Sequence, residues 1–392
     1  MRSGIDLDLR ILSTVADVPE AAWDALCDAR ATPFQRWAWL DAMEKNDCAV
    51  ASKGWHPRHL TLWRGGRLVA AAPAYRRDDS FGEFVFDQGW AQAAMRARIG
   101  YYPKLTLAVP FTPCTGPRFL VAPGEDHDAV VAALLDAAVA LARRESLSSV
   151  HVLFPDEADT ERLARAGWAI RRGVQFHWDN EGYADYDAFL ARFDSKRRHQ
   201  LRRERRAVDA RGITLRTRRG DELSPADADL VWSLYTATVD RFRWGQRYLT
   251  PAFFRDVLGR FRGQLELVEA VREGRVIAGA FNVASSTHLY GRYWGSFEEH
   301  PFLHFAVCYY HSIDACIQRG LRRFEGGAGG DHKLSRGFAP CVTTSAHWVA
   351  HPALDAAVRD FVAREWDAIS RELPALREAA GLRAPAARPE MR

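Results

Sequence analysis

Two stretches of the chain, 170 positions apart, repeat one spacing of aromatic, glycine and His-Trp residues. They cover residues 154–178 and 324–348, and each ends in a His-Trp pair. The matched positions are Phe154 and Phe324, Gly167-Trp168 and Gly337-Phe338, and His177-Trp178 and His347-Trp348. This agreement indicates an internal duplication in which mainly core and turn residues have kept their identity. The chain is therefore expected to fold as two related units, and duplicated domains usually place a ligand cleft between them.

Composition sets the broad class of the protein. The 392 residues suffice for two or three domains, and an apolar content of 47% is ample for their cores. With 27% charged residues and no long apolar run, the sequence excludes a transmembrane helix. The N-terminus carries acids where a signal peptide needs apolar side chains, and the six cysteines show no CxxC or disulfide-framework spacing. A cytoplasmic, reduced protein is expected, and a net charge of +4 is too small to imply general nucleic-acid binding.

The same order of elements is predicted in both halves of the chain. In the first half we expect strands at residues 7–13, 59–63, 68–75 and 149–154, and helices at residues 21–30, 33–45 and 129–144. In the second half we expect strands at residues 265–271, 276–284 and 288–295, a helix at 303–319, and closing strands that end at Phe324 and pass through His347-Trp348. A long helix is expected at residues 186–210. The tail beyond residue 375, rich in Ala, Pro and Arg, is expected to be disordered.

Several segments carry a family resemblance. They are Tyr102-Pro103-Lys104, residues 109–118, Gln175-Phe176-His177-Trp178, residues 195–206, residues 289–295, and residues 324–338. Together they resemble the acetyltransferase fold of the GNAT superfamily, twice over. More specifically they resemble Fem-like proteins, which build aminoacyl bridges on cell-wall precursors, and a related bacterial family of predicted N-acyltransferases. The resemblance implies a mixed α/β (α+β) protein with two tandem GNAT-like acyltransferase domains joined by a basic helix. The expected domains are residues 1–182, residues 183–374 with the basic helix, and a tail at 375–392.

The glycine cluster of the second half is the strongest candidate for a reacting centre. Its glycines let the backbone approach a ligand closely, and successive N–H groups can bind anionic oxygens. We interpret His332 as a general base and Lys333 as an anion clamp beside this loop, although a flexible turn with solvated charges remains the alternative. The loop glycines are Gly326, Gly327, Gly329 and Gly330.

Further candidates flank this loop. Glu325 is positioned to orient or deprotonate an amine, or else to pair with a neighbouring arginine. Strand alternation would send Tyr290, Arg292 and Trp294 to one face and Leu289, Gly291 and Tyr293 to the other. Arg292 and Tyr293 are expected to bind a carboxylate or phosphate, with a cation–π contact in the core as the alternative. The resemblance adds His304 and Arg336 as substrate-binding residues.

In the first half, the rigid loop with Phe111 and Thr115 could line an acceptor site. His177 and His347 occupy matching places in the duplication, which favours a shared structural role. The sequence has no HExxH motif and no paired CxxC motifs, and we predict no metal site.

The stretch from Lys196 to Arg206 carries seven basic residues against one acid, Glu204. Two basic faces on one helix indicate a polyanion such as the tRNA backbone, a lipid pyrophosphate or the surface of a membrane, whereas a merely solvated helix is the alternative. We assign donor binding to Lys196, Arg197, Arg202 and Arg203.

The acyl donor is argued from the loops that would hold coenzyme A. Residues 295–301 and 123–128 take the place of the coenzyme A loop, and both are acidic. Acids suit helix N-termini but oppose a pyrophosphate. We therefore expect an aminoacyl-tRNA co-substrate, no permanently bound cofactor, and an amine of a cell-wall precursor, a peptide or a small molecule as acceptor. An acyl-CoA-dependent N-acetyltransferase and a non-catalytic protein that binds an anion or a cell-wall precursor are the alternatives.

Overall fold

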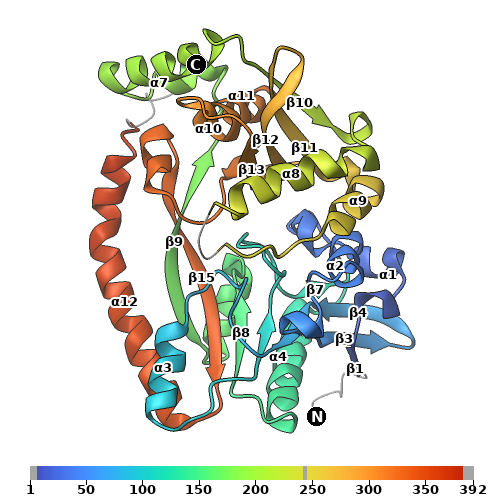
Figure 1. The fold of residues 1–392 in the computed structure, drawn as a ribbon. Coiled ribbons are helices and arrows are strands. Elements are labelled where there is room, and N and C mark those ends of the chain that lie inside the picture. Colours follow the sequence, from blue (N-terminus) through green and yellow to red (C-terminus); the bar gives the residue numbers. More distant parts are fainter. Residues whose placement is uncertain (1–6, 242–244, 383–392) are drawn as a thin grey trace, which may run out of the picture. The chain divides into compact units, whose positions relative to one another are not determined.

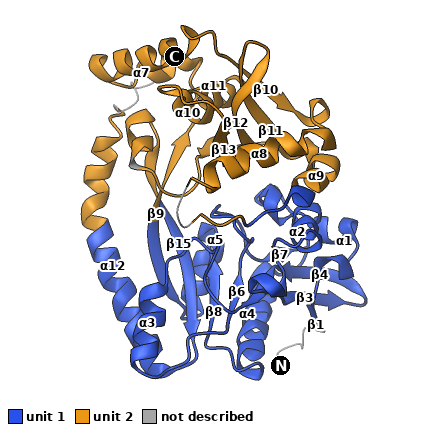
Figure 2. Cartoon of the chain, in the orientation of Figure 1, with its two compact units in different colours: residues 1–173, 248–253, 342–369 blue, residues 174–247, 254–341, 370–392 orange. Residues whose placement is uncertain are grey.

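A computed structural model describes residues 7–241 and 245–382 (Figure 1). The chain divides into two compact units, and neither is continuous in sequence (Figure 2). Unit 1 comprises residues 1–173, 248–253 and 342–369, and unit 2 comprises residues 174–247, 254–341 and 370–392. No helix among the described residues is long and apolar enough to cross a membrane.

Unit 2 contains a set of strands in the order β10-β11-β12-β13-β14-β9. The pairs are antiparallel except β13 and β14, which run parallel. The strands are β10 (Thr214–Arg219), β11 (Leu265–Arg272), β12 (Arg275–Ala284), β13 (His288–Ser296), β14 (Arg323–Glu325) and β9 (Ala169–Asp179). The helices are α6 (Tyr186–Leu190), α7 (Ser195–Asp209), α8 (Ala228–Val239), α9 (Pro251–Arg260), α10 (Leu303–Phe305) and α11 (His311–Gln318). A π-helical turn, Ala306–Tyr310, joins α10 to α11.

Unit 1 contains a four-stranded sheet of order β1-β3-β4-β7 and a second set of strands in the order β15-β8-β6-β5-β2. The first sheet consists of β1 (Asp8–Leu12), β3 (His59–Arg64), β4 (Arg67–Ala72) and β7 (Leu120–Val121). The second set consists of β15 (Ala339–Val349), β8 (Ser149–Leu153), β6 (Lys104–Leu107), β5 (Ala74–Arg77) and β2 (Trp55–Pro57). The helices are α1 (Glu20–Asp24), α2 (Trp37–Lys45), α3 (Gln88–Arg96), α4 (His127–Arg144), α5 (Glu157–Arg165) and α12 (Pro352–Ala379).

The two repeated stretches of the sequence end in the strands β9 and β15. β9 and β15 each have 11 residues and are separated by the same 170 positions as the repeat. β9 follows the first-half elements β8 and α5, yet its Trp178 pairs with Phe324 of β14 in unit 2. β15 follows β14 in the sequence, yet its His347 pairs with His151 of β8 in unit 1. Each half of the chain therefore supplies the closing strand for the unit built mainly from the other half.

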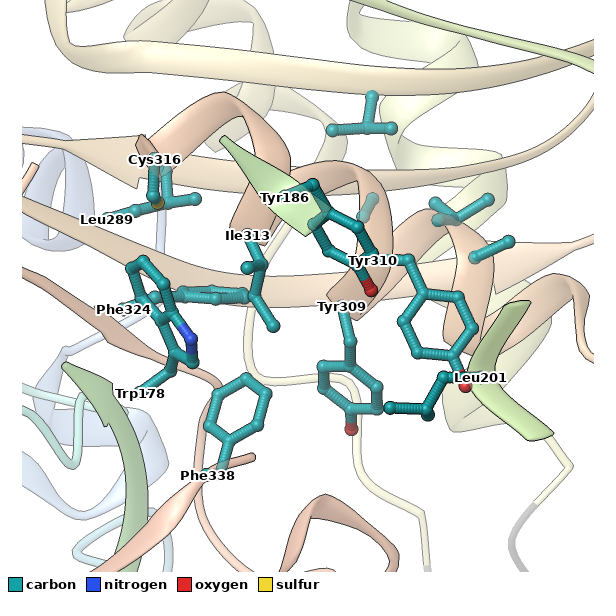
Figure 3. Close-up of a cluster of buried hydrophobic side chains, with 14 of the residues drawn as sticks. Trp178, Tyr186, Leu201, Leu289, Tyr309, Tyr310, Ile313, Cys316, Phe324 and Phe338 are labelled. Atoms are coloured by element: carbon teal, nitrogen blue, oxygen red, sulfur yellow. The ribbon is translucent and has the colours of Figure 1, made fainter. Parts of the chain in front are cut away.

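The cores explain why these elements pack. In unit 2 a cluster of buried aromatic and aliphatic side chains gathers Trp178, Phe324 and Phe338 with Tyr309 and Tyr310 (Figure 3). In unit 1, α4 buries Val130, Val131 and Leu134 on the side that packs against β3, β6, β7 and β8. Burying apolar surface at about 25 cal/mol per Å² is the main stabilising contribution to both units.

The prediction of a mixed α/β protein with two structural units is confirmed, and three local predictions differ. The helix expected at residues 186–210 is interrupted, because Asp194 caps the N-terminus of α7 through the amide of Arg197 at 2.7 Å. The helix expected at 303–319 contains the π-helical turn. The tail expected to be disordered from residue 375 begins as part of α12, because Leu376 and Ala380 pack on the core of unit 2. The rest of that tail, 383–392, lies outside the described residues.

Gly295 provides a test of how α8 packs on β13. A Cβ at Gly295 would lie 1.9 Å from the carbonyl oxygen of Leu234 in α8, so the helix or the strand would have to move. We expect Gly295→Ala to lower the free energy of unfolding by about 1–3 kcal/mol, measured by urea denaturation. Gly263→Ala is the matched control, since nothing lies within 4 Å of its Cβ position. Equal stability of the two variants would contradict this packing.

Candidate active site

The candidate site lies where two parallel strands of unit 2 separate. β13 and β14 pair at His288 with Arg323, Leu289 with Phe324, and Tyr290 with Glu325. β14 then ends, whereas β13 continues to Ser296 alongside β12. In open α/β sheets, ligands bind beyond the carboxyl ends of parallel strands, where neighbouring elements diverge. We call this divergence of the two strands the β13–β14 fork.

Glu325 lies at the base of the fork, with only 4% of its surface exposed. It pairs with His177 of β9, and its Oε2 lies 3.9 Å from the imidazole Nε2. Burial, together with nearby cations such as Arg323, lowers the pKa of His177 to about 3. Glu325 therefore faces a neutral imidazole, and the structural role expected for His177 fits this position.

The glycine loop follows directly after Glu325. Gly327, Gly329 and Gly330 have φ values of +79°, +72° and +93°, a conformation that favours glycine. Gly326 is constrained by contact instead, because a Cβ there would lie 3.1 Å from the Phe338 ring and 3.4 Å from Cε of Lys333. The sequence GGAGG is thus required by the backbone path and by the close approach of neighbouring side chains.

Lys333 turns back toward this loop. Its side chain is buried, and Nζ donates a hydrogen bond to the carbonyl of Gly327 at 2.5 Å. Burial lowers the pKa of Lys333 to about 8, against a smaller opposing effect of the Cys308 thiol. The ammonium group can therefore bind an anion or release its proton near neutral pH.

His332 is exposed, next to a group of aromatic side chains. Its Nε2 lies 2.9 Å from the hydroxyl oxygen of Tyr309, and its ring is 5.7 Å from the rings of His304 and Phe305. Burial and the nearby His332 lower the pKa of His304 to about 4, so His304 is neutral at pH 7. The structure thus places His304 near His332 and Lys333.

Arg336 has partners within the protein. Its Nη2 lies 2.9 Å from Oε2 of Glu204, its Nε donates to Tyr310 at 3.0 Å, and Nη1 donates to the carbonyl of His332 at 2.8 Å. The guanidinium carbon also lies 3.3 Å from the ring centre of Phe305. These contacts fix the segment of His332 and Lys333 to α7. Glu204, the single acid of the basic stretch, is an anchor that sequence reasoning missed.

A β-bulge changes the faces expected for β13. Phe281 pairs with Tyr293 and Asn282 with Gly291, so Arg292 is the extra residue. The alternation is therefore shifted by one residue, and Leu289 and Trp294 pack on the same core although the sequence pattern placed them on opposite faces. Tyr293 packs against Tyr235, with ring centres 4.9 Å apart, and the Arg292 guanidinium lies 5.4 Å from the Tyr293 ring.

The basic residues of α7 divide into exposed and partly buried positions. Lys196, Arg202 and Arg203 are exposed, and Arg197 is half-buried. Arg202 has an ion pair with Asp187 at 2.8 Å. The inner face of the helix is held by Leu201, Glu204 and Val208. The outer face of α7 therefore presents positive charge to solvent. Its inner face carries Glu204, which forms the ion pair with Arg336.

The corresponding fork of unit 1 is filled. β6 and β8 run parallel from Leu105 with Val150 to Leu107 with Val152. Beyond them, Gly116 donates to the carbonyl of Phe154 at 3.2 Å, and Nε of buried Arg118 donates to the carbonyl of Leu153 at 2.6 Å. Loop backbone and the Arg118 side chain therefore occupy the position beyond the parallel strands of unit 1.

The two first-half candidates belong to this filled region. Phe111 is buried, stacks on Tyr248 with ring centres 4.7 Å apart, and contacts Trp55. Thr115 is half-buried. Phe111 and Thr115 lie in unit 1, whereas the other candidate residues belong to unit 2.

Both acidic loops have contacts of their own. Glu298 lies 2.8 Å from His300 and 3.4 Å from Arg272. In unit 1, Asp126 caps α4 through the amide of Ala129 at 3.1 Å, and Glu125 pairs with Arg64 and Arg67. Capping and ion pairing account for these acids, and no basic anion-binding loop replaces them at either place within the described residues.

Comparisons with known proteins agree with this architecture. A family model described as peptidoglycan biosynthesis/recognition, FemAB-like, matches residues 14–384. The chain therefore belongs to the FemAB-like family. No functionally curated protein matches the chain.

Solved structures share the fold at low sequence identity. FemX is 12% identical with a TM-score of 0.54, over 87% of this chain and 98% of that one. The C-terminal domain of a putative lysylphosphatidylglycerol synthetase from Agrobacterium fabrum is 12% identical with a TM-score of 0.52, over 90% and 97%. A tandem GNAT protein from the clavulanic acid biosynthesis pathway has 13% identity and a TM-score of 0.46, over 88% and 99%.

The buried imidazole of His177 predicts a loss of stability in acid. The unfolded chain takes up a proton near pH 6.5, whereas the folded imidazole resists protonation down to its pKa of about 3. Stability therefore falls as the pH drops below about 6.5, and this group contributes a loss of about 2 kcal/mol between about pH 7 and about pH 5. We expect His177→Asn to remove that part of the loss in urea denaturation, whereas exposed His351→Asn leaves it unchanged.

Glu204 provides a test of the anchor between α7 and Arg336. Glu204→Gln would leave the buried guanidinium of Arg336 without its counter-ion, and breaking a buried pair costs about 3–5 kcal/mol. We expect a loss of this size in the free energy of unfolding. Asp209→Asn, on the exposed face of the same helix, is the control. The anchor would be refuted if both variants were as stable as the wild type.

Proposed function

We propose that the protein is a Fem-like N-acyltransferase that passes an aminoacyl group from aminoacyl-tRNA to an amine. The acceptor class is a cell-wall precursor, in keeping with the description of the family, or a peptide or small molecule that carries an amine. The observation that carries the proposal is the β13–β14 fork. It places Glu325, the glycine loop and Lys333 next to one another, and Arg336 connects their segment to the basic helix α7.

The proposed chemistry needs only groups of this chain. The acceptor amine attacks the carbonyl carbon of the aminoacyl ester, a C–N bond forms, and the C–O bond to the ribose of the tRNA breaks. Glu325 or His332 would accept the proton that the amine loses. Lys333 and the N–H groups of the glycine loop would stabilise the oxyanion of the tetrahedral intermediate, and the ribose oxygen leaves with a proton.

The choice of aminoacyl-tRNA as acyl donor rests on the distribution of charge. The outward face of α7 presents Lys196, Arg202 and Arg203, which suits a phosphate backbone. At the place where a GNAT enzyme would hold the pyrophosphate of coenzyme A, Glu298 supplies a negative charge. This contrast favours a nucleic-acid donor over acyl-CoA.

Acyl transfer can be measured without knowing the acceptor, because the labelled ester becomes an amide. The protein is incubated with radiolabelled aminoacyl-tRNAs and a cell-wall precursor extract, and transfer converts a base-labile ester into a base-stable amide. We expect Lys333→Met to reduce the amide label by at least about a hundredfold, whereas Lys45→Met, on an exposed lysine, leaves it unchanged. The label should also fall as the pH rises through about 8, where Lys333 loses its proton. Full transfer by Lys333→Met would rule out this role.

Donor binding is tested with unfractionated tRNA in a filter-binding assay. Changing Lys196, Arg197, Arg202 and Arg203 together to Glu should weaken binding by at least about a hundredfold and flatten its salt dependence. The control changes the same number of exposed arginines, Arg255, Arg262, Arg275 and Arg364, to Glu. If both variants bound tRNA equally, α7 would not be the donor site. Heat released on titration with coenzyme A would support acyl-CoA instead.

A further inference from the structure

Unit 1 contains a buried network of charged side chains that the proposed chemistry does not use. The ammonium group of Lys104 on β6 is fully buried, and it lies 2.8 Å from Oε2 of Glu83 and 2.6 Å from Oδ2 of Asp87. Tyr101 donates a further hydrogen bond to Asp87 at 2.6 Å. Glu83, Asp87 and His151 lie close enough together to hold a cation, but Lys104 already supplies the positive charge there. Removing these charges from water is unfavourable, so the network indicates that the segment it holds must keep a fixed position.

The segment held by this network displays large apolar side chains to solvent. Residues 78–87 contain no helix or strand, and α3 follows them. Phe81 is 53% exposed, Phe86 is 71% exposed, and Met95 on α3 is 70% exposed. Exposed apolar residues scattered singly need no explanation, but three within one short anchored segment indicate an interaction surface.

The backbone at both phenylalanines is fixed by arginine side chains. Arg77 donates to the carbonyl of Phe81 at 2.7 Å, and Arg171 donates to the carbonyl of Phe86 at 2.7 Å. Arg171 is itself held by two hydrogen bonds to Glu365, each of 2.8 Å. The backbone that carries the two rings is therefore held in place. This reduces the conformational entropy that the segment would lose on binding.

The acids of the same segment are paired with cations, whereas two arginines that follow it are exposed. Asp78 pairs with His56 at 2.7 Å and with Arg76 at 3.1 Å, and Asp79 pairs with Arg77 at 2.8 Å. The two remaining acids are buried against Lys104. Arg96 and Arg98 at the end of α3 are exposed. Asp78 and Asp79 are thus paired with cations, and the segment from residue 81 to residue 98 carries exposed apolar side chains and two exposed arginines.

We propose that this surface inserts into the interface of a membrane that carries anionic lipids. It is defined by Phe81, Phe86, Met95, Arg96 and Arg98, and we call it the 81–98 surface. Aromatic and thioether side chains enter the boundary between headgroups and acyl chains, and the flanking arginines bind the anionic headgroups. The complementary charge favours a lipid surface over a protein partner, and the proposal does not depend on the acyl-transfer reaction.

The test is co-sedimentation with vesicles of phosphatidylglycerol and phosphatidylcholine, compared with vesicles of phosphatidylcholine alone. We expect the full chain to bind the anionic vesicles more tightly. Phe81→Ser, Phe86→Ser and Met95→Ser together should weaken that binding by at least about tenfold, because the apolar contact is lost. The control, Leu9→Ser with Phe297→Ser, changes two other exposed apolar residues and should bind as the wild type does.

A second comparison separates the 81–98 surface from the basic helix α7. At high salt, electrostatic attraction to α7 is screened, so the remaining binding should depend on the three apolar residues. Binding of the triple variant equal to that of the wild type would overturn the proposal. The proposal would also be overturned if the wild type did not bind vesicles. If the triple variant then eluted as a smaller assembly than the wild type in size-exclusion chromatography, the surface would be a protein interface.

Discussion

The structure depends on the exchange of two closing strands. β9 is encoded in the first half of the chain but completes the sheet of unit 2, and β15 is encoded in the second half but completes unit 1. Neither sheet has its closing strand until the other half of the chain has supplied it. The exchange also shapes the candidate site, because His177, from the first half, lies beside Glu325 at the base of the β13–β14 fork.

The two units have diverged at the place where a ligand would bind. In unit 1 the loop that ends at Arg118 fills the space beyond the parallel strands with hydrogen-bonded backbone. In unit 2 a glycine loop follows β14, with Lys333 turned toward it and Arg336 tied to Glu204 of α7. The two units therefore keep a related scaffold but differ in the segments that lie beyond their parallel strands.

Sequence patterns predict those features of the structure that depend on residues close together in the chain. The repeat identified the closing strands, and the glycine cluster with Lys333 identified the loop, because backbone conformation and local spacing are written in consecutive residues. No local pattern connects Arg336 with its partner Glu204, because the two residues lie 132 positions apart. The faces of β13 were assigned by strict alternation, and the bulge at Arg292 becomes visible only when β12 is placed beside it. The exposure of Phe86 likewise required the fold.

The identity of the acyl donor tests the account most directly. The protein would be purified from its host under conditions that preserve ester bonds and RNA, and the bound molecules identified by mass spectrometry. The account predicts enrichment of aminoacylated tRNA, which the charge-reversed α7 variant would lose. Copurification of coenzyme A or an acyl-CoA, unchanged in that variant, would contradict the proposed donor.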